Sequence, residues 1–463
     1  MDLCKLIDAL KKIVGSDFVA DDKETLYAYS RDTSPESGFF ADIIVRPKST
    51  EEISEIVKLA NKTKTPIWPR GAATSLVFMG IPLKSGGIVL DLTRMNNIIE
   101  IDEDSMSVTA ETGITWGKLE RELKEKGWYT GFIGPAPGIA STIGGAISVA
   151  SVMYGSAKYG TSGDILLGLE VVLPTGEIIR TGSSALKKSF HHVRYGIGPD
   201  SSGLFCGDQG IFGIKTQFTF KIFPLPKVTR FLHYSYQELE DVLNAFHEMA
   251  SLRIASDLAF ADNKIGVGFL GKGKFPAYIK VEGPNEKIVD AEIELLCEIN
   301  EKWHGKKEKE DPAKAILQDQ LYTFFPMAGR MGNFGASCNK IPIKRTKQFH
   351  EFFKELLAEH DENIKKYKIL PAWYSFVSQN AMDVLPTFAL PVHDDEAFEF
   401  GRKLWRELIV KEIESQGSIH YWLGKVIGDV VADNYKENYY DFIKKMKQTL
   451  DPNNILNPTL LKL

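Results

Sequence analysis

Two glycine-rich segments of the sequence are suited to holding a pyrophosphate. The first runs from Pro69 to Ser75, and the second comprises Gly134–Gly138 followed by Ser141–Gly145. Small residues let backbone N–H groups approach phosphate oxygens, hydroxyl groups add donors, and Arg70 could supply positive charge. One such loop alone is more typical of a tight turn, but two of them beside strands favour a dinucleotide site.

Three side chains in the C-terminal half are candidates for moving a proton or orienting a substrate. His420 and Tyr421 are adjacent in the segment 418–425, and His393 precedes two acids in the segment 391–395. Imidazole and phenol groups are both capable of acid–base catalysis. Simple packing with hydrogen bonds is an equal alternative for His420 and Tyr421. For His393, a surface position at a strand end is the favoured alternative.

The cysteines do not form a metal-binding set. Cys4, Cys206, Cys297 and Cys338 are far apart, and no C-x-x-C pair is present. This excludes the usual ligand sets for an Fe–S cluster or a structural zinc within this chain. A metal cluster that accepts electrons from this protein would therefore belong to a partner.

Composition limits the classes of function. With 463 residues the chain is expected to form two or three domains. A net charge of −5 argues against nucleic acid as a partner. No apolar stretch approaches the ~18 residues of a membrane span, and the N-terminus lacks the apolar block of a signal peptide. We therefore expect a cytoplasmic protein without a membrane span.

The elements around the first loop predict a mixed domain. Apolar spacing predicts an amphipathic helix over residues 3–13, and Ser49 with Glu52 forms a capping box before a second helix. Strands are expected at 42–45, 65–68, 87–92 and 105–111, and a helix from Trp116 stops at Gly127. The order strand–helix–strand–loop–strand favours an α+β or α/β domain.

A change in composition and in the order of the predicted elements after Pro226 predicts a second domain. Residues 165–174 and 178–181 are expected to pair as strands across a turn, and strand-like residues resume at 212–224. Beyond Pro224 and Pro226, helices rich in Lys and Glu alternate with strands, and glycine clusters largely disappear. We expect a cofactor domain at 1–226, a substrate or cap domain at 227–415, and a segment at 416–463 that returns to the first domain.

These segments resemble the FAD domain of the vanillyl-alcohol oxidase and para-cresol methylhydroxylase (PCMH) superfamily, whose members include D-lactate dehydrogenases and the flavin subunit of glycolate oxidase. The resemblance covers about residues 40–226 and the last dozen residues. The matching positions are Arg70–Ser75, Thr142–Gly145, Tyr159–Gly160, Asp164, Gly168–Leu173, Gly176, Gly203–Phe205, Gly207, Gly210, Gly213, Ile214, Asp451–Asn453 and Asn457–Pro458.

The resemblance implies an α+β fold in which FAD lies between two subdomains, with its isoalloxazine under an inserted α/β cap domain. It implies that the first loop wraps the pyrophosphate, that the second loop lines the adenosine and ribityl portions, and that the backbone of Ile214 contacts the flavin. The implied cofactor residues are Pro69, Arg70, Gly71, Ala72, Ala73, Thr74, Ser75, Pro135, Gly138, Ser141, Thr142, Gly144, Gly145 and Ile214.

Several positions depart from the family pattern. Ala72 and Ala73 replace glycines, and Thr74 stands where members with a covalent flavin carry His, so non-covalent FAD is expected. The metal-binding motif of the hydroxy-acid branch is missing apart from His420, so no metal is expected. The phenol-oxidising branch uses an Arg where Trp422 stands and an Asp where Thr161 stands. Neither branch's substrate can be assigned from the sequence.

The resemblance implies an FAD-dependent dehydrogenase. We expect it to oxidise a small organic alcohol or 2-hydroxy acid by hydride transfer to the flavin, and to pass electrons to a partner such as an electron-transferring flavoprotein or an Fe–S subunit. Two alternatives stay open: a flavin-carrying electron-transfer subunit of a larger complex, and a phenol-oxidising enzyme of the vanillyl-alcohol oxidase type.

Overall fold

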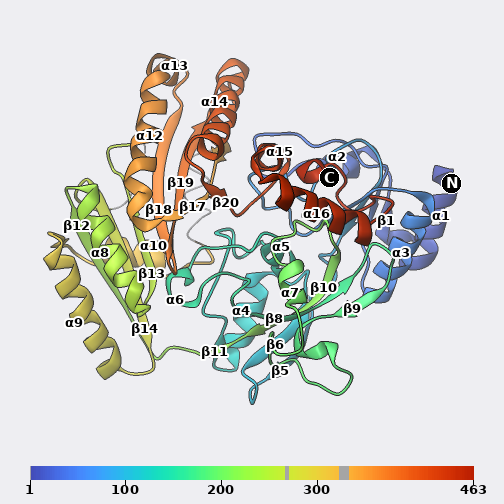
Figure 1. The fold of residues 1–463 in the computed structure, drawn as a ribbon, viewed down its shortest axis with the longest axis horizontal. Helices are drawn as coiled ribbons and strands as arrows, with labels where there is room; N and C mark the ends of the chain where they lie inside the picture. The colour runs from blue at the N-terminus through green and yellow to red at the C-terminus, as the bar shows by residue number, and fades with distance from the viewer. Residues whose placement is uncertain (1, 266–270, 323–332) are drawn as a thin grey trace.

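The computed structural model describes residues 2–265, 271–322 and 333–463. These residues form three β-sheets of four or more strands, two in the N-terminal half and a large one after residue 227. Figure 1 shows the N-terminal sheets on one side of the molecule and the large sheet with its long helices on the other. No helix in these ranges is both long and apolar enough to span a membrane.

The first sheet positions the first glycine-rich loop. Its strand order is β1-β2-β4-β3, and β4 pairs in parallel with both β2 and β3. Ser49 Oγ accepts the Glu52 N–H at 3.2 Å and begins the helix between β2 and β3, so the predicted capping residue is confirmed. The elements are α1 (Leu3–Val14), β1 (Val19–Ala20), α2 (Lys23–Tyr29), β2 (Ile43–Val45), α3 (Thr50–Thr63), β3 (Ile67–Arg70) and β4 (Ile88–Asp91).

The second sheet is antiparallel and has the order β5-β6-β10-β8-β9. The predicted pair of strands across the Thr175–Gly176 turn is confirmed as β8 and β9. Its strands are β5 (Ile98–Asp102), β6 (Ser107–Glu111), β8 (Leu166–Val172), β9 (Ile178–Arg180) and β10 (Ile214–Lys221). Around it lie α4 (Trp116–Glu125), β7 (Trp128–Tyr129), α5 (Ile143–Ser148), α6 (Ser156–Tyr159), α7 (Ser201–Leu204) and β11 (Phe223–Pro224).

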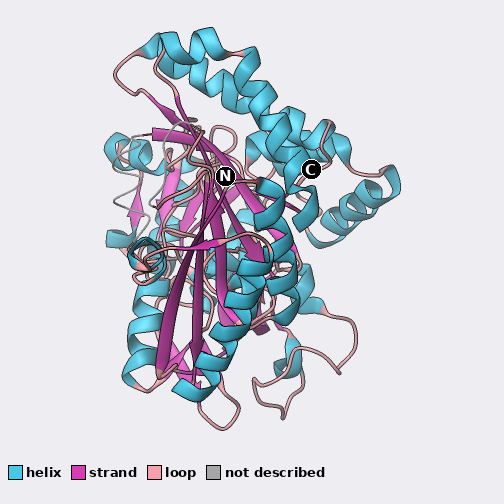
Figure 2. Cartoon of the chain, turned by 90° about the vertical axis from the view of Figure 1, so that its left-hand side faces the viewer, coloured by secondary structure: helices cyan, strands magenta, loops and turns pink. Residues whose placement is uncertain are grey.

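A nine-stranded antiparallel sheet begins with β12 at Val228. Its long helices contact the sheet (Figures 1 and 2), while α6 of the N-terminal half contacts β13 and β18. The strands are β12 (Val228–Tyr236), β13 (Ala255–Ala261), β14 (Phe275–Gly283), β15 (Lys306–Lys307), β16 (Asn333–Ala336), β17 (Asn339–Pro342), β18 (Leu370–Ser378), β19 (Ala381–Leu390) and β20 (Ile419–His420). The helices are α8 (Leu239–Leu252), α9 (Glu286–Lys302), α10 (Asp311–Leu317), α12 (Thr346–Glu359), α13 (Asp361–Lys366) and α14 (Asp395–Glu414).

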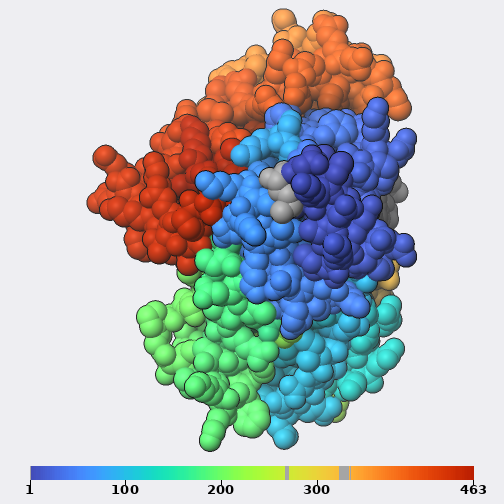
Figure 3. Space-filling view, turned by 90° about the vertical axis from the view of Figure 1, so that its right-hand side faces the viewer, coloured from blue at the N-terminus to red at the C-terminus, as the bar shows by residue number. Residues whose placement is uncertain are grey.

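The C-terminal segment packs against the N-terminal half. It contains α15 (Lys425–Asn434) and α16 (Glu437–Leu450). The Ile67 N–H donates to the Ile455 carbonyl at 2.7 Å, and Asn457 Nδ2 donates to the Gln209 carbonyl at 2.7 Å. Figure 3 shows these C-terminal residues in red beside blue and green segments on one face. The last residues of the chain therefore help to form the region around the first loop.

Candidate functional site

A cavity of about 270 Å³ lies where the two glycine-rich loops, the large sheet and the C-terminal segment meet. Of the cofactor residues expected from the sequence, all except Gly138 line it. Tyr421 also lines the cavity, whereas His420 and His393 do not. Lining residues not singled out beforehand include Thr112, Met153, Tyr154, Gln209, Lys215, Tyr374, Phe376, Leu385, Thr387 and Asn457.

Arg70 stabilises the first loop through hydrogen bonds to backbone carbonyls. It ends β3, and its Nη1 atom donates to the backbone carbonyls of Tyr29, Arg31 and Gly80 at 3.1–3.2 Å. Its guanidinium also lies 4.7 Å from the centre of the Tyr29 ring. Arg70 therefore fastens the loop to the end of α2 and to the loop's own far end, in addition to lining the cavity.

The backbone of the first loop presents unpaired donors. Within the described part of the chain, the backbone N–H groups of residues 71–76 have no hydrogen-bond acceptor. Ala73 has a φ of +51°, a conformation that glycine adopts more easily. Successive free N–H groups around a residue in the left-handed region are typical of anion-binding nests. The loop therefore fits a pyrophosphate.

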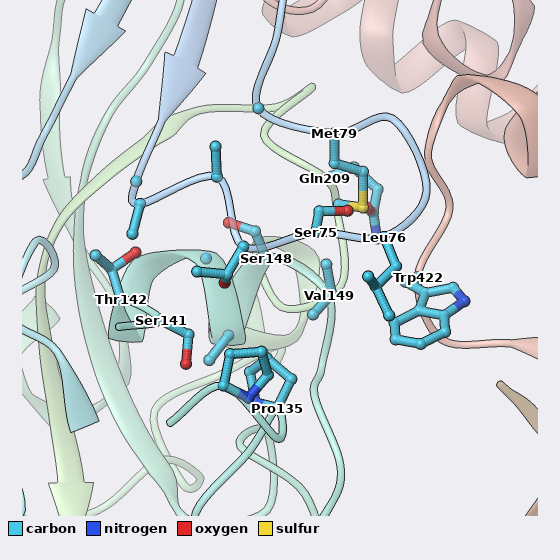
Figure 4. A pocket seen from close by; sticks show the side chains of 18 of the residues that line it. Ser75, Leu76, Met79, Pro135, Ser141, Thr142, Ser148, Val149, Gln209 and Trp422 are labelled. Atoms are coloured by element: carbon cyan, nitrogen blue, oxygen red, sulfur yellow. The ribbon is translucent and has the colours of Figure 1, made fainter. Parts of the chain in front are cut away.

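The second loop contacts the first through the Thr142 side chain, which lies directly against Gly71. A Cβ atom on Gly71 would lie 2.1 Å from Thr142 Oγ1, and one on Gly144 would lie 2.8 Å from the Cβ of Thr112. Ser141 Oγ is buried and has no partner among the described residues. Figure 4 shows hydroxyl groups of Ser141, Thr142 and Ser75 around the cavity. These residues form a cradle of backbone and hydroxyl donors that fits the phosphates and sugars of a dinucleotide.

Residues beside Ile214 complete this end of the cavity. Lys215 Nζ lies 2.6 Å from Asp208 Oδ1, and both side chains are buried. Gln209 lines the cavity with its Oε1 atom unpartnered in the described structure and has a φ of +55°. Neither Asp208 nor Gln209 was expected from the sequence to take part in this site. They directly precede Gly210, one of the positions that match the family, and this was the available signal for a role here.

The other end of the cavity is apolar and contains three phenols. Antiparallel pairing of β18 with β19 sets Ala372 opposite Thr387 and Tyr374 opposite Leu385, so alternate side chains share one face. Tyr154 and Tyr421 approach from outside these two strands. Burial raises the pKa values of Tyr374 and Tyr421 well above their usual range, so both keep their protons. A protonated phenol is able to donate a hydrogen bond to a ligand oxygen.

His420 lies behind Tyr421 and is fully enclosed. Its Nε2 atom is 3.5 Å from Glu412 Oε2, and both ring nitrogens lack a hydrogen bond within the described ranges. Burial lowers the pKa of His420 to about 3 and raises the pKa of Glu412 to about 8. Both groups are therefore uncharged near neutral pH. Since His420 is screened from the cavity, its position suits support of Tyr421 rather than contact with a substrate.

The remaining two predicted residues lie outside the cavity lining. His393 is exposed in the turn between β19 and α14. Gly138 is packed against Ile133 and Leu321. A Cβ atom added at Gly138 would lie 3.0 Å from the side chain of each of them. Among the described residues that line the cavity, none from the large sheet carries a charge.

Comparison with known proteins agrees with this geometry. Residues 41–182 match the family model described as FAD binding domain, and residues 225–460 match that of FAD linked oxidases, C-terminal domain. The chain is 27% identical to glycolate oxidase subunit GlcD of Bacillus subtilis, over 97% of this chain and 95% of that one. It is 26% identical to D-lactate dehydrogenase of Anaerostipes hadrus, over 90% and 88%.

Two solved structures share the fold. p-Cresol methylhydroxylase with substrate bound superimposes with a TM-score of 0.86 at 19% identity, covering 99% of this chain and 96% of that one. 4-Ethylphenol oxidase from Gulosibacter chungangensis gives a TM-score of 0.82 at 22% identity, covering 99% and 97%. The expected fold class, family and cofactor are confirmed. The chain belongs to the FAD-linked oxidases and is an FAD-binding oxidoreductase of the PCMH fold.

Proposed function

We propose that this protein is a dehydrogenase that binds FAD non-covalently and oxidises a small, uncharged organic alcohol or phenol. The observation that carries the proposal is the apolar end of the cavity, where the polar groups suited to a hydroxyl are uncharged: the phenols of Tyr154, Tyr374 and Tyr421, the Thr387 hydroxyl and the Trp422 indole N–H. A carboxylate would require a positive partner there, and no Lys, Arg or His of the described large-sheet residues lines this end.

The protein's own residues would bind the cofactor, orient the substrate and enclose the reacting bond. The unpaired N–H groups of residues 71–76 and the hydroxyls of Ser141 and Thr142 would hold the cofactor phosphates and sugars. FAD supplies the acceptor of a hydride from the substrate carbon. The tyrosine hydroxyls would orient the substrate oxygen. Phe376, Leu385 and the other apolar residues of this end would exclude water from the reacting bond.

A 2-hydroxy acid is the second candidate substrate, and it is favoured by two relatives. The curated names of these relatives are glycolate oxidase subunit and D-lactate dehydrogenase, and the matches span at least 90% of this chain. The word subunit in the first name also supports a protein partner that accepts the electrons, such as an electron-transferring flavoprotein or an Fe–S protein. If the cavity binds no substrate, the remaining interpretation is a flavin-carrying electron-transfer subunit of a larger complex. A cytoplasmic location stays a prediction from the sequence.

The attachment of the flavin is directly testable. Thr74 offers no imidazole or thiol for a covalent bond, so we expect acid precipitation to release all the FAD into the supernatant. Visible absorption of pellet and supernatant checks this. A yellow pellet would contradict the prediction and reveal a covalent link from another residue.

Substrate class is tested by anaerobic reduction of the bound flavin. We expect para-alkylphenols or benzylic alcohols to bleach the visible absorption at least tenfold faster than glycolate or D-lactate, since a carboxylate would be desolvated without a partner. Tyr421→Phe, which removes one hydroxyl from the cavity, should raise KM roughly tenfold. Tyr439→Phe, at an exposed tyrosine, is the matched control. Faster bleaching by the hydroxy acids would select the second candidate instead.

A further inference from the structure

A second, small cavity of about 10 Å³ adjoins the apolar end of the main one. The two cavities share Met153, Tyr154, Tyr374 and Phe376 in their linings. A space of this size is about that of a single water molecule. Asp257 lines the small cavity, and it is the one carboxylate among the described residues lining either cavity. The phenols of Tyr154 and Tyr374 therefore stand between the substrate end and a buried acid.

Asp257 is held firmly in this position. It lies on β13 beside a register shift at Ser256, a bulge that re-aims the following side chain. Its side chain is almost fully buried. Oδ1 accepts the Gly155 N–H at 2.9 Å, and Oδ2 accepts from Gln320 Nε2 at 3.1 Å and from Ser256 Oγ at 3.0 Å. An ionised carboxylate has about four acceptor sites, so one stays available to a water in the small cavity.

Burial favours uptake of a proton by Asp257, whereas the charges around it act in both directions: Lys280 lowers its pKa and Glu282 raises it. Lys280 is paired with it across β13 and β14, but Lys280 Nζ lies 2.8 Å from Glu282 Oε2. Glu120 is a further buried acid near the same lysine. Glu120 also has Lys124 as a partner, with Lys124 Nζ 3.9 Å from Glu120 Oε2. Asp257 and Glu282 are therefore the acids that share Lys280 most directly. Tyr374 from β18 and Tyr159 from α6 also face Asp257. Burial is the main cause that raises the pKa of Asp257, and the neighbouring Glu282 adds to it.

We propose that Asp257 accepts the proton that the substrate hydroxyl loses during oxidation, through Tyr154 or Tyr374 and a water in the small cavity. This inference rests on the proposed function. As the substrate carbon gives its hydride to FAD, the hydroxyl proton passes to the tyrosine oxygen, the tyrosine proton passes to the water, and a water proton passes to Asp257. The carboxylate becomes a carboxylic acid, and the substrate leaves as a neutral oxidised product.

The Asp257→Asn variant tests whether Asp257 takes up the substrate proton or only supports the local structure. Asparagine keeps an oxygen for the Gly155 N–H but cannot take up the proton. We expect flavin reduction by substrate to slow at least tenfold while FAD binding is retained, and a thermal scan checks that the variant is folded despite the donors of Gln320 and Ser256 that face the new amide nitrogen. In the wild-type protein, kcat/KM should fall as pH decreases through the raised pKa of Asp257, and this acid limb should be absent from Asp257→Asn.

Glu282→Gln is the matched control, because Glu282 belongs to the same network but lines neither cavity. It should keep the acid limb and move it to lower pH, since a negative neighbour of Asp257 is removed. An Asp257→Asn enzyme with wild-type rate and pH profile would overturn the proposal.

A spectroscopic measurement that needs no turnover distinguishes failure of the Asp257 proposal from failure of the proposed function. Infrared difference spectra of the FAD-loaded protein with and without 4-nitrophenol should show a newly protonated carboxylic acid in wild type and none in Asp257→Asn. No such band in wild type, or the same band in Asp257→Asn, would reject Asp257 as acceptor even if the enzyme turns over. A flavin that no alcohol or phenol reduces would instead reject the proposed function.

Discussion

Gly424→Ala is expected to weaken FAD binding by about 100-fold, which corresponds to about 2.7 kcal/mol. A Cβ at this position would lie 1.5 Å from the Val77 carbonyl oxygen and 3.0 Å from that of Phe78. These backbone atoms belong to the segment that follows the first loop, and Lys425 N donates to the Phe78 carbonyl at 3.2 Å. Because the clash is with backbone atoms, it is relieved only by moving the C-terminal segment and residues 77–78 apart, and both line or adjoin the cavity.

The measurement is a fluorescence titration of the apoprotein with FAD, with a thermal scan of each variant. Gly428→Ala is the control, since a Cβ there would lie 3.4 Å from Leu460 in ordinary contact. It sits within α15, where alanine favours the helix by roughly 1 kcal/mol. Equal FAD affinity of Gly424→Ala and wild type would show that the C-terminal segment does not shape the flavin site.

Glu412→Gln is expected to make the protein more stable at pH 8 and to flatten its pH dependence. The side chain is fully buried, and Oε1 accepts from Ser337 Oγ at 2.8 Å. Its pKa is raised by burial to about 8 in the folded protein, whereas an unfolded Glu titrates near 4.3. The folded protein therefore holds a proton that the unfolded chain has lost, and stability falls as pH rises between these two values.

The size of the effect follows from proton linkage. Between pH 6 and pH 8 the wild type should lose roughly 2 kcal/mol of stability through Glu412. Glutamine keeps the acceptor for Ser337 and places an N–H toward the uncharged His420, so this loss should disappear. His420 acts in the opposite direction, because its pKa is lowered to about 3 in the folded protein, whereas an unfolded His titrates near 6.5. Stability through His420 therefore rises until the unfolded imidazole loses its proton just above pH 6, in the variant as in wild type.

Denaturant midpoints at pH 6 and pH 8 provide the test. Glu414→Gln is the control, since Glu414 is exposed two residues further along the chain. It should leave the difference between the two midpoints as in wild type. Parallel pH dependence in Glu412→Gln and wild type would mean that Glu412 is already ionised in the folded state.

Local patterns were sufficient for the elements that carry the cofactor loops. The apolar spacing of α1, the capping residue Ser49 and the turn between β8 and β9 are determined by neighbours within a few residues. The strand β5 was missed because it is an edge strand with exposed Ile99 and Glu100, and it lacks an apolar alternation. The sequence alone also identified the family, through many short matches in the correct order.

Only the tertiary structure decided which residues surround the substrate. Tyr374 and Leu385 face the cavity because of the register between β18 and β19, and as strand residues they are indistinguishable in sequence from core. Asp257 reaches the small cavity through a bulge and a contact with Gly155, 102 positions away. Conversely, His420 stood out in sequence but is turned into the interior beside Glu412. Side-chain direction in a sheet depends on pairing between distant segments, which neighbouring residues do not specify.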